Sequence, residues 1–344
     1  MGRISLPQQP EDVPWPTQRW PQAKPGPEID RTRLEAGFER LLAPEPPAAV
    51  GATHGLLVVH RGQIVAEGYD AANGPDNRLP SWSMAKGVLH ALVGIAVRLG
   101  RLRLDAPAGV EAWSAPDDPR RAITLDQLLR MTSGVGFDEE YTDLETSSTL
   151  QMLFGDGKDD MAAFAAGFPA IAEPDAAWCY SSGSSNIVSA LLGAAVGGGE
   201  AGMRAFMQRE LTVPLGMTSA EPRFDAAGTW IASSFLFATA RDFARFGLLC
   251  LRDGVWEGRR ILPEGWIDYG RTPTPQSGGE YGAHFWLALD GSGTFSCNGF
   301  RGQYTLMVPE RDLVLVRLGT SMPEQKRGSY LALADLIECF PKLA

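Results

Sequence analysis

The sequence has few residues of the types that metal and thiol chemistry require. Its 344 residues include only four cysteines and four histidines. The cysteines form no Cys-x-x-Cys pair, and their wide spacing is typical neither of a zinc site nor of a dense disulfide framework. They are Cys179, Cys250, Cys297 and Cys339. We therefore expect buried free thiols, no bound metal and no organic cofactor.

The sequence also has no uninterrupted apolar run long enough to span a membrane. Its first residues, MGRISLPQQPEDVPWP, contain no apolar segment of a secretory signal, so we expect a cytoplasmic protein without a membrane partner. The formal net charge is -10, from 41 acidic and 31 basic residues, and an acidic surface repels phosphate backbones. Nucleic acid is therefore not an expected partner, and the oligomeric state stays open.

The composition is that of a globular protein, with 44% hydrophobic and 21% charged residues. Residues 1–28 are the exception, because they carry seven prolines and can form neither a helix nor a central strand. An extended arm lying on the body, anchored by Trp15 and Trp20, is one interpretation. A mobile tail is the other.

Hydrophobic periodicity predicts the remaining elements. Asp30 is expected to cap a first helix and residues 55–70 to form a β-hairpin. The segment from residue 79 is expected to contain a largely buried helix, which has Ser83 at its N-terminal end and is closed by Gly100. Helical segments follow, including 184–196 and 202–211. Strand-like runs begin at residues 284, 294 and 304, and 327–341 is helical. This order predicts an α/β (α+β) domain from residues 29–105 and 231–344, with a helical domain at 106–230 inserted.

The first candidate chemical group is Ser83-Met84-Ala85-Lys86. Residues three apart on a helix lie on one face, so the hydroxyl and the amine can meet. A serine hydroxyl needs a base to become a nucleophile, and a lysine becomes that base when burial lowers its pKa. A capping serine beside a surface lysine is the alternative, but the long apolar residues around the motif disfavour a solvated helix start.

Two further motifs are weaker by themselves. Tyr180 and Ser182 are two residues apart in WCYSSG, so their side chains can project the same way, although helix capping and packing would explain them equally well. Gly299 and Gly302 lie in CNGFRGQ, where one predicted strand meets the next. Glycines there permit either a close approach of the backbone to a substrate or merely a tight turn.

Together the three motifs resemble a known family. Ser83-x-x-Lys86, Tyr180-x-Ser182 and the strand edge at Gly299 occur in the order seen in class C-type β-lactamases, penicillin-binding proteins and their esterase and amidase relatives. MTSGV at 131, PLGMTSA at 214 and ILPEGWID at 261 extend the resemblance to roughly residues 35–340. It implies a β-lactamase/transpeptidase-like fold, with an antiparallel sheet flanked by helices.

The resemblance also implies roles. Ser83 would attack a carbonyl and form an acyl-enzyme, while Lys86 and Tyr180 move protons as a coupled pair. The backbone N–H groups of Ser83 and Phe300 would form the oxyanion hole. Ser182, which stands where many lactamases carry asparagine, would hydrogen-bond either the Lys86–Tyr180 pair or the substrate.

The sequence departs from the lactamase pattern at the third motif, where Cys297-Asn298-Gly299 replaces Lys-Thr-Gly. The missing lysine would supply charge for a β-lactam or peptide carboxylate, and Arg301 is a candidate substitute. We therefore expect a serine hydrolase for small esters or amides, similar to 6-aminohexanoate-oligomer hydrolases. β-Lactamase or D,D-peptidase activity, and a catalytically silent binding protein on the same fold, are the alternatives.

Other side chains could line the substrate site. Trp82 adjoins the nucleophile and could wall an acyl pocket, although core packing would also explain it. Tyr141 follows the acidic residues Asp138–Glu140 in a predicted loop that is either part of the substrate mouth or a solvated turn. A Ser-His-Asp hydrolase is disfavoured because the chain has no Gly-x-Ser-x-Gly elbow, and His284 is expected either to pack or to line the pocket.

Overall fold

The computed structural model describes residues 4–343, so the first three residues of the proline-rich segment lie outside the described residues. Its centre is a six-stranded antiparallel sheet in the order β2-β1-β11-β10-β9-β8, which joins strands from both ends of the chain. The strands are β1 (Ala52–His60), β2 (Gln63–Tyr69), β8 (Trp286–Leu287), β9 (Phe295–Gly299), β10 (Gln303–Val308) and β11 (Leu313–Thr320).

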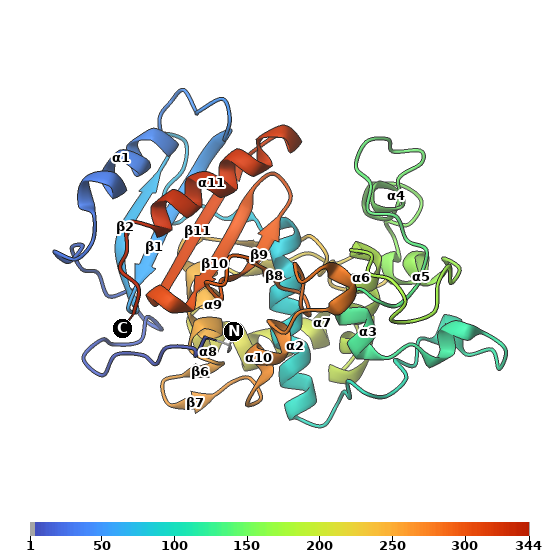
Figure 1. Cartoon of the computed structure of the whole chain (residues 1–344). Coiled ribbons are helices and arrows are strands. Elements are labelled where there is room, and N and C mark those ends of the chain that lie inside the picture. Colours follow the sequence, from blue (N-terminus) through green and yellow to red (C-terminus); the bar gives the residue numbers. More distant parts are fainter. Residues whose placement is uncertain (1–3, 344) are drawn as a thin grey trace.

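Helices cover both faces of this sheet. Helices α1 (Arg31–Leu41) and α11 (Lys326–Ile337) lie on one face, and α9 (Ala240–Leu251) lies on the other (Figure 1). Successive residues of a strand point to opposite faces, so Leu56 packs in the core under α1 and α11 while Leu57 packs in the larger core on the other side. Both side chains are fully buried.

Helix α2 (Ala85–Arg98) lies between the sheet and a group of helices farther from it (Figure 1). Every residue of α2 from Ala85 to Ala96 is buried, because neighbours surround the helix on all sides. The other helices are α3 (Leu125–Leu129), α4 (Ser148–Phe154), α5 (Met161–Ala166), α6 (Ser182–Val196), α7 (Gly199–Met207), α8 (Val213–Leu215) and α10 (Trp266–Gly270).

Short elements complete the fold. Two small sheets are formed by β3 (Leu79–Pro80), β5 (Leu236–Ala238) and β4 (Glu221–Pro222), and by β6 (Val255–Trp256) with β7 (Arg259–Arg260). Among residues 4–343, the helices are too short or too polar to pass through a lipid bilayer. The division into an α/β domain and an inserted helical domain stays a prediction.

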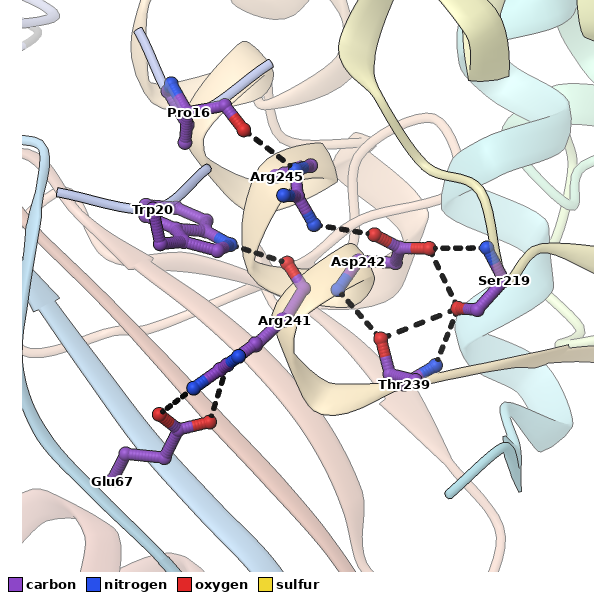
Figure 2. Close-up of polar contacts among 8 residues, drawn as sticks. All are labelled: Pro16, Trp20, Glu67, Ser219, Thr239, Arg241, Asp242 and Arg245. Carbon is purple, nitrogen blue, oxygen red and sulfur yellow. Dashed lines mark hydrogen bonds and ion pairs between the residues drawn. The ribbon is translucent and has the colours of Figure 1, made fainter. Parts of the chain in front are cut away.

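The proline-rich segment lies against the body. Ile64 at the outer edge of β2 donates its backbone N–H to Pro21 and accepts one from Ala23, at 2.9 and 3.0 Å. Trp20 is 4% exposed and donates its indole N–H to the backbone carbonyl of Arg241, while Arg245 donates to the carbonyl of Pro16 (Figure 2). The segment therefore covers the sheet's edge strand, which would otherwise expose unpaired backbone groups.

Several predicted elements have the expected bounds, and two do not. The side chain of Asp30 caps α1, and the predicted hairpin is β1 with β2. The strand predicted from residue 284 is wrong over most of its length, because φ at His284 is +63° and only Trp286–Leu287 is extended. The segment predicted as a helix at 202–211 is helical throughout, with a π-helical turn, Gln208–Thr212, following α7. The helix predicted at 327–341 ends early, because α11 stops at Ile337.

Candidate active site

Ser83 lies in a 3-10 turn, Trp82–Met84, that leads directly into α2. The preceding Ser81 holds this turn: its backbone N–H donates to the carbonyl of Leu236 in β5 at 2.8 Å, and its hydroxyl oxygen accepts from the backbone N–H of Leu236 at 3.1 Å. Trp82 has φ of +44°, a left-handed conformation that is uncommon for a large side chain. Ser83 itself is partly exposed, so a substrate can reach its hydroxyl.

Lys86 is buried one helical turn after Ser83, with 1% of its surface exposed. Its Nζ donates hydrogen bonds to Ser83 Oγ at 3.0 Å, to Ser182 Oγ at 3.1 Å and to the backbone carbonyl of Ser233 at 2.9 Å. Burial lowers the pKa of Lys86 from 10.5 to about 8, against the opposing charge of Glu139. A substantial fraction of this amine is therefore uncharged in mildly alkaline solution.

Tyr180 lies over the amine, with the centre of its ring 4.9 Å from Lys86 Nζ. Burial raises the pKa of its phenol above the ordinary value, the charge of Glu139 adds to this, and a side-chain hydrogen bond with Ser83 opposes it. The ring is held edge-on against Tyr281, at 5.7 Å between centres. Tyr180 is therefore a protonated phenol at neutral pH, and it contacts both Lys86 and Ser83.

Ser182 begins α6, directly after the residue that caps the helix. Its hydroxyl accepts from Lys86 and donates to Oε1 of Glu139 at 2.7 Å, while its backbone N–H donates to Oε2 at 2.6 Å. The contact with Lys86 is one of the two alternatives that the sequence left open. Glu139 was not singled out by sequence reasoning, which named it only within an acidic loop.

Tyr141 lies in the same loop, and its side chain contacts both Glu139 and the third motif. Its hydroxyl donates to Glu139, and its ring stacks on Phe300 with 5.0 Å between centres. The Trp82 ring lies edge-on to Phe300 at 5.4 Å and also contacts Phe235 at 5.7 Å. These aromatic side chains form a wall beside Ser83. Whether they contact substrate stays a prediction.

The third motif reaches this wall through a close approach of two backbones. A side chain added at Gly299 would lie 2.3 Å from the carbonyl oxygen of Ser81, so β9 can only lie this close to the Ser83 turn with a glycine there. Phe300 follows immediately, and Arg301 and Gly302 have φ of +61° and +78° in the tight turn to β10. The oxyanion-hole role of the Ser83 and Phe300 amides stays a prediction.

Cys297 occupies the position of the lysine that is missing from the third motif, and Arg301 was the candidate substitute for that lysine. Arg301 is exposed, and its guanidinium lies over the Phe300 ring at 5.8 Å. Among the described residues, no polar contact joins it to the Ser83–Lys86 group. Cys297 is buried, with its sulfur packed so closely on α2 that a side chain at Gly87 would overlap it. Burial raises the pKa of the Cys297 thiol.

His284 is also buried, with Nε2 3.3 Å from the hydroxyl of Ser185 in α6. Burial lowers the pKa of its imidazole well below the ordinary value. No hydrogen bond between His284 and Ser83 is found in the part of the chain that the structure describes. Within residues 4–343, no group of three or more His, Cys, Asp or Glu side chains is arranged to hold a metal ion.

Comparisons with known proteins agree with this architecture. The chain is 24% identical over 336 residues to a 6-aminohexanoate-dimer hydrolase from Paenarthrobacter ureafaciens, covering 84% of this chain and 78% of that protein. A Bacillus anthracis structure, named provisionally as such a hydrolase, superposes with a TM-score of 0.73 at 21% identity, covering 98% and 92% of the two chains. A family VIII carboxylesterase superposes with a TM-score of 0.65 at 14% identity, covering 90% and 99%.

These structural likenesses show the β-lactamase/transpeptidase-like fold that the sequence predicted. The model of the protein family described as Beta-lactamase matches residues 47–338, which include all three motifs. The chain therefore belongs to the β-lactamase family of hydrolases and their relatives.

Proposed function

We propose that this protein is a serine hydrolase that cleaves small ester or amide substrates through an acyl-enzyme on Ser83. The observation that carries the proposal is the contact of a partly exposed hydroxyl with a buried amine, 3.0 Å apart. A neutral amine at this distance can accept the hydroxyl proton as the oxygen attacks. The 6-aminohexanoate-dimer hydrolase and carboxylesterase relatives agree with amide and ester substrates.

The two proton-handling groups have different tasks in this mechanism. Lys86, whose pKa is lowered to about 8, takes the proton as the Ser83 oxygen bonds to the substrate carbonyl carbon. Tyr180, whose pKa is raised, supplies a proton to the leaving oxygen or nitrogen as its bond to carbon breaks. Lys86 then returns a proton to the Tyr180 oxygen. Water hydrolyses the acyl-enzyme by the reverse movements.

The backbone amides of Ser83 and Phe300 are the proposed oxyanion hole. Each such donor contributes on the order of 3 kcal/mol to transition-state stabilisation in acyl-transfer enzymes. The close approach at Gly299 supports this role, because it holds the β9–β10 turn beside the serine turn.

The third motif supports esters and linear amides over β-lactams. Cys297 is buried and uncharged, and Arg301 lies outward over Phe300. Neither residue offers a buried cation to a substrate carboxylate beside Ser83. We expect slow or absent hydrolysis of nitrocefin compared with simple esters.

Hydrolysis of p-nitrophenyl butyrate by the wild type and by Ser83→Ala, at about pH 8, tests the proposal. Turnover by the wild type and none by the variant is the expected result. Equal turnover by both would overturn the assignment of Ser83. A folded wild type that turns over neither this ester nor a matching amide, and does not react with a fluorophosphonate, would favour a catalytically silent binding protein.

A further inference from the structure

Glu139 is an acidic residue whose charge acts on Lys86, and each polar group that is hydrogen-bonded to its carboxylate is a donor. Its carboxylate accepts from the Tyr141 hydroxyl, from the Thr149 hydroxyl at 3.2 Å, and from both the backbone N–H and the hydroxyl of Ser182. The neighbouring Asp138 and Glu140 are exposed, whereas Glu139 is partly buried. An ionised carboxylate only accepts hydrogen bonds, so this set of contacts satisfies it.

We infer that Glu139 is a positioning residue, which fixes the Ser182 hydroxyl as an acceptor and thereby directs the lone pair of Lys86 at Ser83. The inference rests on the proposed function, because it concerns the step in which Ser83 loses its proton. It adds a residue to that step without placing Glu139 in contact with substrate.

The argument begins with the single hydrogen of the Ser182 hydroxyl. That hydrogen is directed to Glu139 Oε1 at 2.7 Å, since a carboxylate cannot donate in return. The lone pairs of the Ser182 oxygen are then free to accept from Lys86 Nζ at 3.1 Å. Glu139 thus determines that Ser182 accepts from the lysine and does not donate to it.

The second step concerns the uncharged amine, which has two hydrogens and one lone pair. The backbone carbonyl of Ser233 can only accept, and it lies 2.9 Å from Nζ. The backbone N–H of Ser233 is held in turn by the side-chain oxygen of Asn186 at 3.1 Å. Ser182 and Ser233 together occupy both hydrogens of the amine. The lone pair is left facing the third neighbour, Ser83 Oγ, at 3.0 Å.

In a variant without the carboxylate, the Ser182 hydroxyl is no longer restricted to accepting a hydrogen bond from Lys86. With glutamine at 139, the side-chain amide can donate to Ser182, whose hydroxyl is then free to donate to the lone pair of Lys86. Ser182 would compete with Ser83 for the base, and the fraction of molecules ready to react would fall. Positioned general bases contribute roughly 10²–10⁴-fold, so loss of alignment is expected to lower the rate at least about tenfold.

The charge of Glu139 gives a second, independent readout. The titratable groups on the elements packed around Lys86 are Glu139, Tyr141, Tyr180, His284 and Cys297. Burial raises the pKa values of the Tyr141 phenol and the Cys297 thiol, so both are uncharged at neutral pH. Tyr180 and His284 are uncharged at neutral pH because burial shifts their pKa values away from it. Glu139 is therefore the charge that raises the pKa of Lys86 against the effect of burial. Removal of this charge should lower the pKa of Lys86 further. In a plot of kcat/KM against pH, the midpoint of the rise should then move to lower pH, while the plateau at high pH falls.

The experiment measures kcat/KM for p-nitrophenyl butyrate from about pH 6 to about pH 10, for the wild type, Glu139→Gln and the control Glu140→Gln. Glu140 neighbours Glu139 and is exposed, with Thr142 as its side-chain hydrogen-bond donor. Glu139→Gln should lower the plateau at least about tenfold and shift the midpoint to lower pH. Glu140→Gln should leave both unchanged. Thermal melts and the fraction labelled by a fluorophosphonate correct for unfolded protein.

Ser182→Ala completes the test, because Glu139 is argued to act through that hydroxyl. In the Ser182→Ala background, Glu139→Gln should still shift the midpoint but lower the plateau no further. A wild-type plateau in Glu139→Gln, or full additivity of the two losses, would overturn the inference while the proposed function stands.

If Glu139→Gln does not fold, Glu139→Asp replaces it. This variant keeps the charge on a shorter side chain, and an unchanged plateau in it would overturn the inference equally. A wild type without turnover would overturn the proposed function, and this inference with it.

Discussion

The Nζ atom of Lys86 lies 4.9 Å from the centre of the Tyr180 ring, and burial shifts the pKa values of these two groups in opposite directions. Burial disfavours the charged form of each group, which is the ammonium of the lysine and the phenolate of the tyrosine. Both groups are consequently driven toward neutrality. A neutral amine and a neutral phenol are a base and an acid in the same site, which is what acyl transfer requires.

The first prediction is the pH dependence of the wild type. The pKa of Lys86 is lowered to about 8, so below that pH most of the amine is an ammonium that cannot accept a proton. We expect kcat/KM for p-nitrophenyl butyrate to rise with pH and to level off above about pH 8. A profile that is flat from about pH 6 to about pH 9 would mean that Lys86 is not the base.

The second prediction separates the acid from the base. Tyr180→Phe removes the phenol that is proposed to protonate the leaving group. An amine must be protonated as it leaves, whereas p-nitrophenolate leaves readily as an anion. We expect Tyr180→Phe to lower kcat/KM for a butyryl anilide by about 10²-fold or more, and for p-nitrophenyl butyrate by a smaller factor. Equal losses on the two substrates would contradict this division of roles.

The third prediction concerns the stability that the buried lysine costs. Because its pKa is 10.5 when unfolded and about 8 when folded, the unfolded chain binds more protons between these values. Stability due to this residue therefore rises with pH across that window and is lowest below pH 8. One pKa unit corresponds to about 1.4 kcal/mol, so the full change is about 3 kcal/mol.

Lys86→Met keeps the length of the side chain but has no titrating group, and it serves as the reference. Urea unfolding gives the free energy of unfolding of both proteins at about pH 7 and about pH 10. The difference between wild type and variant should change in favour of the wild type by most of the expected change of about 3 kcal/mol as the pH rises. The same variant should be inactive at both pH values. A difference between wild type and variant that does not depend on pH would contradict the lowered pKa.

The site illustrates which parts of a fold a sequence can predict. The contact of Ser83 with Lys86 follows from helical spacing, since residues three apart share a face. The approach of Tyr180 does not follow from local spacing, because it depends on how α6 packs beside α2; the family resemblance supplied it. That strands from both chain ends share one sheet was predicted from the order of element types, whereas the strand order within that sheet was not.

Glu139 shows the opposite case. It lies between α3 and α4 in a segment without regular secondary structure, so no periodicity indicates which side chains point inward. Three consecutive acidic residues, Asp138–Glu140, are equally typical of a solvated loop. Tertiary contacts with Ser182 and Thr149 distinguish the middle one, and neither contact follows from local spacing. The outward position of Arg301 was likewise hidden, because it depends on a turn with positive φ.

The fourth prediction concerns the proline-rich segment that covers the edge of the sheet. Trp20 is almost completely buried against α9 and bonds to the carbonyl of Arg241 (Figure 2). The adjacent Arg19 is exposed. Trp20→Ala should lower the free energy of unfolding by about 3–5 kcal/mol, the usual loss for a buried tryptophan. Arg19→Ala is the matched control and should change it by less than about 0.5 kcal/mol.

The fraction of folded Trp20→Ala that a fluorophosphonate labels should equal that of the wild type, because none of the contacts of Trp20 involves Ser83 or Lys86. Urea unfolding measures the first quantity and active-site labelling at low temperature the second. If Trp20→Ala were no less stable than Arg19→Ala, the segment would not be fastened to the body through this side chain. A loss of labelling in the folded variant would instead couple the segment to the active site, through α9 and the β5 strand that holds the Ser83 turn.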